Sequence, residues 1–120
     1  MPYLAKDRKQ YIDGGGQVVT EGDLTYVLTR ACLNACDIGP FLENALNAEC
    51  GAYLENGRNN YATRCQIMGA LECARREFRR RRPDSYLMIN AAISEVQRRF
   101  YDEIIAPYED SKIESNGDVF

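Results

Sequence analysis

The sequence has no histidine among its 120 residues. Histidine is the side chain whose ordinary pKa lies closest to neutrality, so the commonest acid–base group of enzymes is missing. A phosphate-binding loop is missing too, because the three glycines at 14–16 are not followed by a helix that opens with Lys-Ser or Lys-Thr. We therefore expect no catalytic residues and no resident cofactor.

No stretch approaches the roughly eighteen consecutive apolar residues of a membrane span. Residues 1–16 also lack the apolar run of a signal peptide, so we expect a cytoplasmic protein with no membrane partner. The five cysteines fit a reducing compartment. Cys32 and Cys36 are one helical turn apart, but no second cysteine pair accompanies them. We expect small buried thiols and no metal site.

The length suits one domain covering residues 1–120. A net charge of −3 argues against a protein built to coat nucleic acid. The charges are segregated, however, with arginines crowded at 75–82 and carboxylates at 109–118. This segregation predicts that the two regions meet, within one subunit or between the subunits of a homo-oligomer.

The sequence lacks the sustained alternation of β-branched residues that strands need, so we expect an all-α fold. Two segments, 61–82 and 84–107, carry apolar residues three and four positions apart, which places them on one side of a helix. The first stripe comprises Ile67, Leu71, Ala74 and Phe78, and the second comprises Ile89, Ile93, Val96, Phe100 and Ile104. A long C-terminal helical hairpin is therefore predicted.

Prolines mark the ends of this hairpin's helices. Pro83 cannot donate a backbone hydrogen bond and ends the first helix just before it. Asp84 or Ser85 can cap the second helix, and Pro107 limits its other end. The polar segment at 108–120 that follows is expected to fold back and dock its last residues on this bundle or on a neighbour's; the alternative is a frayed terminus.

Two further helices precede the hairpin. One begins near Asp23, after a Thr20–Asp23 capping box, and runs to about Cys36. Its stripe comprises Leu24, Val27, Leu28, Ala31 and Cys32. The other begins at Pro40 and ends at Asn56-Gly57, with an apolar side made of Phe41, Leu42, Ala45, Leu46, Tyr53 and Leu54. Residues 1–19 are expected to form a partly ordered arm with a short helical turn around 5–12. The four main helices pack as a bundle or as two hairpins.

The arginines near Pro83 are the strongest candidates for function, because guanidinium groups match phosphate oxygens in shape and charge. The ligand-binding residues that we predict are Arg75, Arg79, Arg82, Tyr86, Arg98 and Arg99, with the tyrosine stacking on a base. The alternative is that the arginines complement the helix dipole and pair with acidic neighbours, or clasp the acidic surface of a partner protein.

Three blocks resemble a family of small phage and prophage proteins of unassigned function: GDLTYVLTR at 22–30, GALECARREF at 69–78, and APYEDSKIESNGDVF at 106–120. The last block matches the family's ending, Tyr-Glu-Asp, Lys, Asn-Gly-Asp-Val-Tyr/Phe. Here, unlike in the family, the segment RRRRPDS and a further helix separate the second block from the ending. The resemblance implies an all-α viral protein in the host cytoplasm, and it brings no catalytic residues.

Small phage proteins often act against host defence, and one route is to sequester a nucleotide signal. We expect such a ligand, and a host protein is the alternative partner. A third hypothesis is enzymatic. Residues 21–31 resemble a metal-binding helix of the MazG-like nucleotide pyrophosphatases, with Glu21 and Asp23 as its carboxylates, but the ExxE motif of that family does not occur.

Overall fold

The computed structural model describes residues 4–35, 40–57 and 60–117. Its helices are α1 (Lys6–Asp13), α2 (Glu21–Leu33), α3 (Pro40–Asn56), α4 (Tyr61–Arg81), α5 (Tyr86–Phe100) and α6 (Ala106–Asn116). A 3-10 turn (Pro83–Ser85) joins α4 to α5, and a π-helical turn (Tyr101–Ile105) joins α5 to α6. The described residues contain no strand, and the all-α prediction is confirmed.

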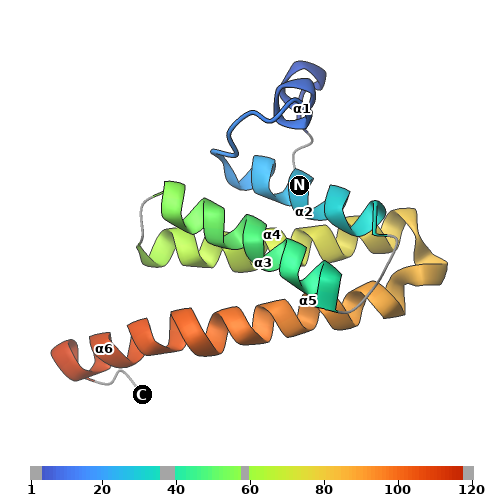
Figure 1. Ribbon diagram of the computed structural model, residues 1–120. Coiled ribbons are helices and arrows are strands. Elements are labelled where there is room, and N and C mark those ends of the chain that lie inside the picture. The colour runs from blue at the N-terminus through green and yellow to red at the C-terminus, as the bar shows by residue number, and fades with distance from the viewer. Residues whose placement is uncertain (1–3, 36–39, 58–59, 118–120) are drawn as a thin grey trace.

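Helices α2 to α5 form a four-helix bundle (Figure 1). Helix α2 packs against α3 and α4, and α5 packs against the same two helices, so α2 and α5 occupy opposite corners. Helix α1 lies outside the bundle next to α2, and α6 continues the line of α5. None of the described helices is long and apolar enough to cross a membrane.

The predicted stripes of α2, α4 and α5 form the core. Their buried members are Leu24, Val27, Leu28, Cys32, Ile67, Leu71, Ala74, Phe78, Ile89, Ile93, Val96 and Phe100. The prediction for α3 was partly wrong, because Phe41 is 74% exposed and Ala45 is also exposed. The buried side of α3 runs through Leu42, Leu46 and Cys50, and the two exposed residues each precede that line by about 100° of helix rotation.

Pro107 does not end the helix, contrary to prediction. The π-helical turn before it widens the hydrogen-bond spacing, and Pro107 falls in the first turn of α6, where no backbone donor is needed. The same turn holds one residue more than an α-helical turn would. The next buried position is therefore Ile105, which is 2% exposed, and the predicted Ile104 is only half-buried.

The predicted cap of α5 is also absent. Ser85 occupies the N-cap position, but its side chain makes no capping hydrogen bond. Its backbone angles, φ −103° and ψ 2°, are not the extended ones that aim a cap side chain at the first turn. The 3-10 turn takes its place, with the amide of Ser85 donating to the carbonyl of Arg82 at 3.2 Å.

A cluster of tyrosines holds α6 against the start of α4. The rings of Tyr61 and Tyr108 stack with centroids 5.8 Å apart. The hydroxyls of Tyr61 and Tyr101 donate to the carboxylate of Glu109 at 3.0 and 3.2 Å. Hydrogen bonds with Cys65 and then Glu109 raise the pKa of Tyr61 to about 12. Residues 106–116 do not fold back as expected but continue the line of α5 as a helix, with Tyr108 and Glu109 against the start of α4. The predicted docking of the last residues falls on 118–120, which lie outside the described residues.

The prediction that the thiols are buried was only partly right. Cys32 and Cys50 are buried, but Cys65 is exposed and Cys73 is half-buried, while Cys36 lies outside the described residues. Burial raises the pKa of Cys32 to about 11 and that of Cys50 to about 12. Cys65 occupies a position of α4 outside its buried stripe.

Among the described thiols, iodoacetamide is therefore expected to alkylate Cys65 first at pH 8, because attack requires an accessible thiolate. Cys32 and Cys50 should stay unmodified until urea unfolds the bundle, and peptide mass spectrometry follows each site separately. Labelling of Cys50 at the rate of Cys65 in the native protein would contradict the described core.

Candidate ligand-binding site

Arg75 lies in the interface between α4 and α5, not on an open surface. Its guanidinium donates to the side chains of Asn90 and Gln97 on α5 and to the Ser94 hydroxyl at 2.9 Å. It also pairs with Glu72 at 3.1 Å, and its side chain is only 13% exposed. These contacts occupy the group with the chain's own acceptors and join the two helices.

The other predicted residues do not converge on one site. The guanidinium carbon of Arg79 lies 5.2 Å from the ring centre of Tyr86, so these two predicted residues contact each other. Arg82 is exposed at the C-cap of α4. Arg98 pairs with Glu95 at 2.5 Å and with Asp102 at 3.2 Å, well along α5 from the 3-10 turn at Pro83–Ser85.

Arg99 is half-buried, next to Arg98 in the last turn of α5. It and Arg98 are twelve or more residues beyond Tyr86, which is about 18 Å along a helix. The six residues therefore span most of the α4–α5 hairpin and do not line one cavity.

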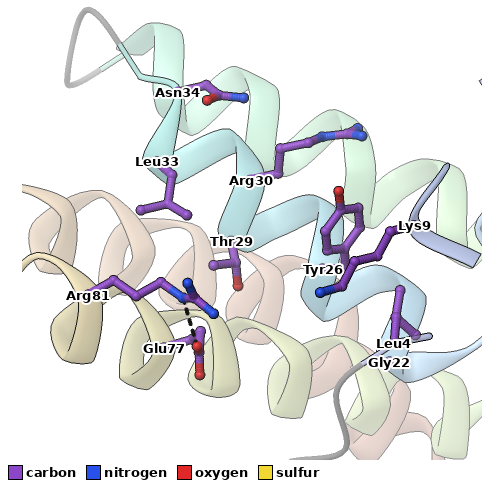
Figure 2. Close-up of a pocket in the computed structure, with 10 residues that line it drawn as sticks. All are labelled: Leu4, Lys9, Gly22, Tyr26, Thr29, Arg30, Leu33, Asn34, Glu77 and Arg81. Atoms are coloured by element: carbon purple, nitrogen blue, oxygen red, sulfur yellow. Dashed lines mark hydrogen bonds and ion pairs between the residues drawn. The ribbon is translucent and has the colours of Figure 1, made fainter. Parts of the chain in front are cut away.

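A pocket does lie elsewhere, where α1 and α2 meet the end of α4 (Figure 2). It has a volume of about 280 Å³. Its lining combines apolar, aromatic and cationic side chains from three helices and the chain before α1: Leu4, Lys9, Gly22, Tyr26, Thr29, Arg30, Leu33, Asn34, Glu77 and Arg81. Of these residues, only Arg81 belongs to the arginine cluster recognised in the sequence.

Tyr26 organises two of the three cations. The guanidinium carbon of Arg30 lies 5.6 Å from the centre of its ring, and Nζ of Lys9 lies 5.9 Å from it. The Tyr26 hydroxyl donates to Asp13 at 2.8 Å, and Arg30 pairs with the same carboxylate at 2.5 Å. Burial, together with the hydrogen bond to Asp13, raises the pKa of Tyr26, and the hydrogen bonds from Tyr26 and Arg30 lower the pKa of Asp13.

The third cation approaches from α4. Arg81 donates through Nε to Oε1 of Glu77 at 2.8 Å, one helical turn back. Glu77 is buried, and Arg81 is about half exposed, so the remaining guanidinium nitrogens of Arg81 face the pocket region. In Figure 2 its side chain points towards Thr29 on α2. The pocket thus has cations from α1 and α2 on one side and from α4 on the other.

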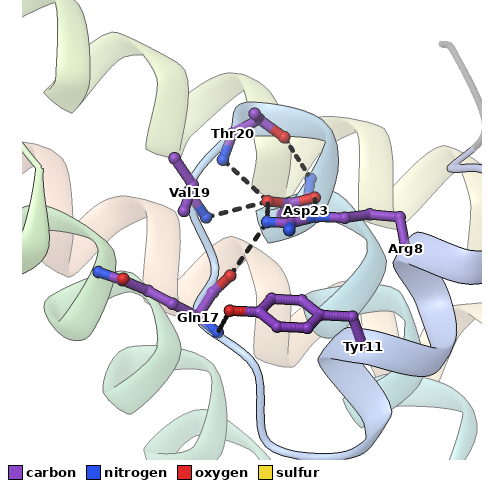
Figure 3. Close-up of polar contacts among 6 residues, drawn as sticks. All are labelled: Arg8, Tyr11, Gln17, Val19, Thr20 and Asp23. Carbon is purple, nitrogen blue, oxygen red and sulfur yellow. Dashed lines mark hydrogen bonds and ion pairs between the residues drawn. The ribbon is translucent and has the colours of Figure 1, made fainter.

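The wall formed by α1 is held by an ion pair between Arg8 and Asp23 (Figure 3). Arg8 donates through two nitrogens to the two oxygens of Asp23, at 3.1 and 2.5 Å. The backbone amides of Val19 and Thr20 donate to the same carboxylate at 2.9 and 3.1 Å. These donors, the arginine first, hold the pKa of Asp23 far below its ordinary value.

The predicted capping box is confirmed within this cluster, because the Thr20 hydroxyl accepts from the amide of Asp23 at 3.1 Å. Within the arm, the short helical turn expected around 5–12 is a full helix over Lys6–Asp13, with Ile12 buried. The following loop needs glycine: Gly15 has φ +94°, and a Cβ on Gly16 would lie 2.4 Å from the Tyr11 ring.

The structure gives Asp23 a role other than the one in the pyrophosphatase hypothesis. Its side chain is 1% exposed and both oxygens already accept hydrogen bonds from the protein. Among the residues that the structure describes, no three Asp, Glu or Cys side chains are grouped so as to hold a metal ion.

Sequence reasoning missed Lys9, Tyr26, Arg30 and Arg81 as pocket residues. A signal existed on α2, where Tyr26, Thr29, Arg30 and Leu33 are spaced i, i+3, i+4, i+7 and form a second stripe beside the buried one. No pattern within one segment could show that Lys9 and Arg81, 72 positions apart in the numbering, share a pocket.

Comparisons of the chain with family models, with curated proteins and with solved structures found no match. The resemblance to phage proteins therefore stays a prediction, and any functional conclusion must rest on the geometry described above.

Proposed function

We propose that this protein is a non-catalytic binder of a small phosphorylated molecule, which it takes up in the pocket between α1, α2 and α4. The observation that carries the proposal is the convergence of Lys9, Arg30 and Arg81 on one pocket, in which Arg30 also pairs with Asp13 and Arg81 also pairs with Glu77. Several cations from separate elements match the several oxygens of a phosphate. The pocket, to which Arg81 contributes, replaces the arginine cluster at 75–82 as the place where such a ligand binds.

The rest of the lining indicates what the phosphate is attached to. Leu4 and Leu33 offer apolar contact, whereas the ring of Tyr26 already interacts with two cations and serves to orient them. Ligand pockets usually measure about 300–1,000 Å³, and this one is at the lower limit. It suits a molecule of the size of one nucleotide, and a larger nucleotide signal would extend outside it.

Calorimetric titration of the purified protein with phosphate, nucleoside monophosphates, cyclic nucleotides and ADP-ribose tests the proposal. At least one phosphorylated compound should bind, and Arg81→Gln should weaken its binding about tenfold or more, because a charged hydrogen bond contributes about 1.5–3 kcal/mol. Glutamine can still reach Glu77, which preserves the fold.

Arg76→Gln is the matched control, because Arg76 is on the same helix, pairs with Glu72 at 3.7 Å and lies away from the pocket. Its affinity should change less than twofold. Absence of heat across the whole panel, or equal losses from both substitutions, would contradict the proposal.

A protein-binding module is the second candidate, and the exposed apolar side chains favour it. Phe41, Leu87 and Met88 are 74%, 78% and 58% exposed. A partner protein from the host would be retained in stoichiometric amount by the immobilised chain and released by Phe41→Ser. In either role, the resemblance to phage proteins would place the activity in the host cytoplasm, with sequestration of a nucleotide signal as the anti-defence route.

A further inference from the structure

The oppositely charged regions of the sequence do not meet within the chain. The segment 79–85, which we call the arginine elbow, has four arginines and one aspartate, and α6 has three carboxylates and one lysine. Figure 1 shows the elbow and α6 at opposite ends of the molecule, whose longest dimension is 44 Å. Salt screens charges beyond about 8–10 Å, so neither end neutralises the other.

Charged groups at both ends remain open to solvent. Arg79 and Arg82 are exposed at the elbow, and Asp110 and Glu114 are exposed on α6. The carboxylate of Glu109, by contrast, is occupied by the two tyrosine hydroxyls. The two ends of the molecule thus carry exposed charges of opposite sign.

An outward stripe connects the two ends. On α5 the residues Leu87, Ala91, Ser94 and Arg98, spaced by four, three and four, are all exposed. Beyond the π-helical turn the exposed Ile113 lies close to the same side. Ile113 is 26 residues after Leu87, and the π-helical turn absorbs one of them. The remaining 25 or so residues rotate the helix by about 100° each, close to seven full turns, so the two side chains lie on nearly the same side.

We infer that the α5–α6 stripe binds a second copy of this chain, in antiparallel orientation about a two-fold axis near Phe100. Such a pair brings Leu87 against the partner's Ile113 and the elbow against the partner's Asp110 and Glu114. Each contact occurs twice, because the interface is formed by the same surface of both subunits. Arg98 and Asp102 lie next to the axis.

Charge complementarity is what selects a second copy as the occupant. Parallel pairing would set arginine against arginine, whereas antiparallel pairing neutralises both ends at once. Most of the pocket lies away from this interface, because its lining comes mainly from α1 and α2, and α2 lies at the corner opposite α5; Arg81 alone belongs to both the pocket and the elbow. The inference is therefore independent of the proposed ligand.

Sedimentation velocity on charge-reversed variants tests this interface. An elbow variant, Arg79→Glu with Arg82→Glu, and a tail variant, Asp110→Lys with Glu114→Lys, should each be monomeric at concentrations where the unmodified chain is a dimer. A 1:1 mixture of the two should form the dimer again, because the elbow of each variant then faces an opposite charge. Raising the salt concentration should weaken the unmodified dimer.

Lys6→Glu, an exposed charge change on α1, is the control and should leave the dimer unchanged. Circular dichroism checks that each variant remains helical. A monomeric unmodified chain, a dimer that survives both reversals, a mixture that stays monomeric, or open-ended polymers would each overturn the inference.

Discussion

Replacing Asp23 by alanine is expected to lower the free energy of unfolding by about 3 kcal/mol. The substitution removes the N3 side chain of the capping box and leaves the part-buried backbone amides of Val19 and Thr20 without their acceptor. It also removes the partner of Arg8, so that α1 keeps only its other contacts with α2, those of Asp13 with Tyr26 and Arg30 among them. Urea denaturation followed by circular dichroism measures the change, and a loss below about 1 kcal/mol would contradict the role assigned to Asp23.

Asp7→Ala is the matched control. Asp7 is also a carboxylate on this arm, but it is exposed, and its oxygen accepts only from the amide of the next residue among the described contacts. A surface change of this kind should alter stability by no more than about 0.5 kcal/mol.

The contribution of Asp23 should also depend on pH. Its pKa is held below the ordinary value of 3.8 in the folded protein, so the folded state binds this proton less readily than the unfolded chain does. The stabilisation is therefore fully present above about pH 4 and is lost as the pH falls further. The difference in unfolding free energy between the unmodified chain and Asp23→Asn should shrink over that range.

Arg75→Ala is expected to destabilise the protein by about 2 kcal/mol without changing ligand affinity. Its guanidinium contacts three side chains of α5 and one of α4, and the alanine variant leaves those partly buried groups without their donor. Thermal unfolding and calorimetry together separate this structural role from the ligand-binding role that the sequence had suggested.

The neighbouring Arg76→Ala provides the comparison. Arg76 is 80% exposed and reaches the same Glu72 only at 3.7 Å, so its loss should cost no more than about 0.5 kcal/mol. Equal destabilisation by the two substitutions would mean that Arg75 does not join α4 to α5 as described.

The fold could be predicted largely from local patterns. The stripes of α2, α4 and α5 depend on spacing within one helix, and the Thr20–Asp23 box lies within four residues. The π-helical turn escaped prediction because Pro107 has the same local signature whether a helix ends or resumes there. The exposure of Phe41 depends on which side of α3 faces its neighbours, which composition does not specify.

The candidate site could be predicted much less well. A run of arginines attracts attention in a sequence, but Arg75 faces α5 and Arg98 pairs along its own helix. The pocket depends on the position of α1, which is set by Arg8 reaching Asp23 across fifteen residues. That ion pair has no signature in the spacing of either residue.

The most direct test of the account is an amide correlation spectrum recorded while a nucleoside monophosphate is added to the isotope-labelled chain. Binding in the pocket predicts shifts centred on Lys9, Gly22, Tyr26, Thr29 and Arg81, with saturation at one ligand per chain. An unchanged spectrum at millimolar ligand, or shifts confined to residues 82–86 with none at Lys9, Gly22, Tyr26 or Thr29, would contradict it.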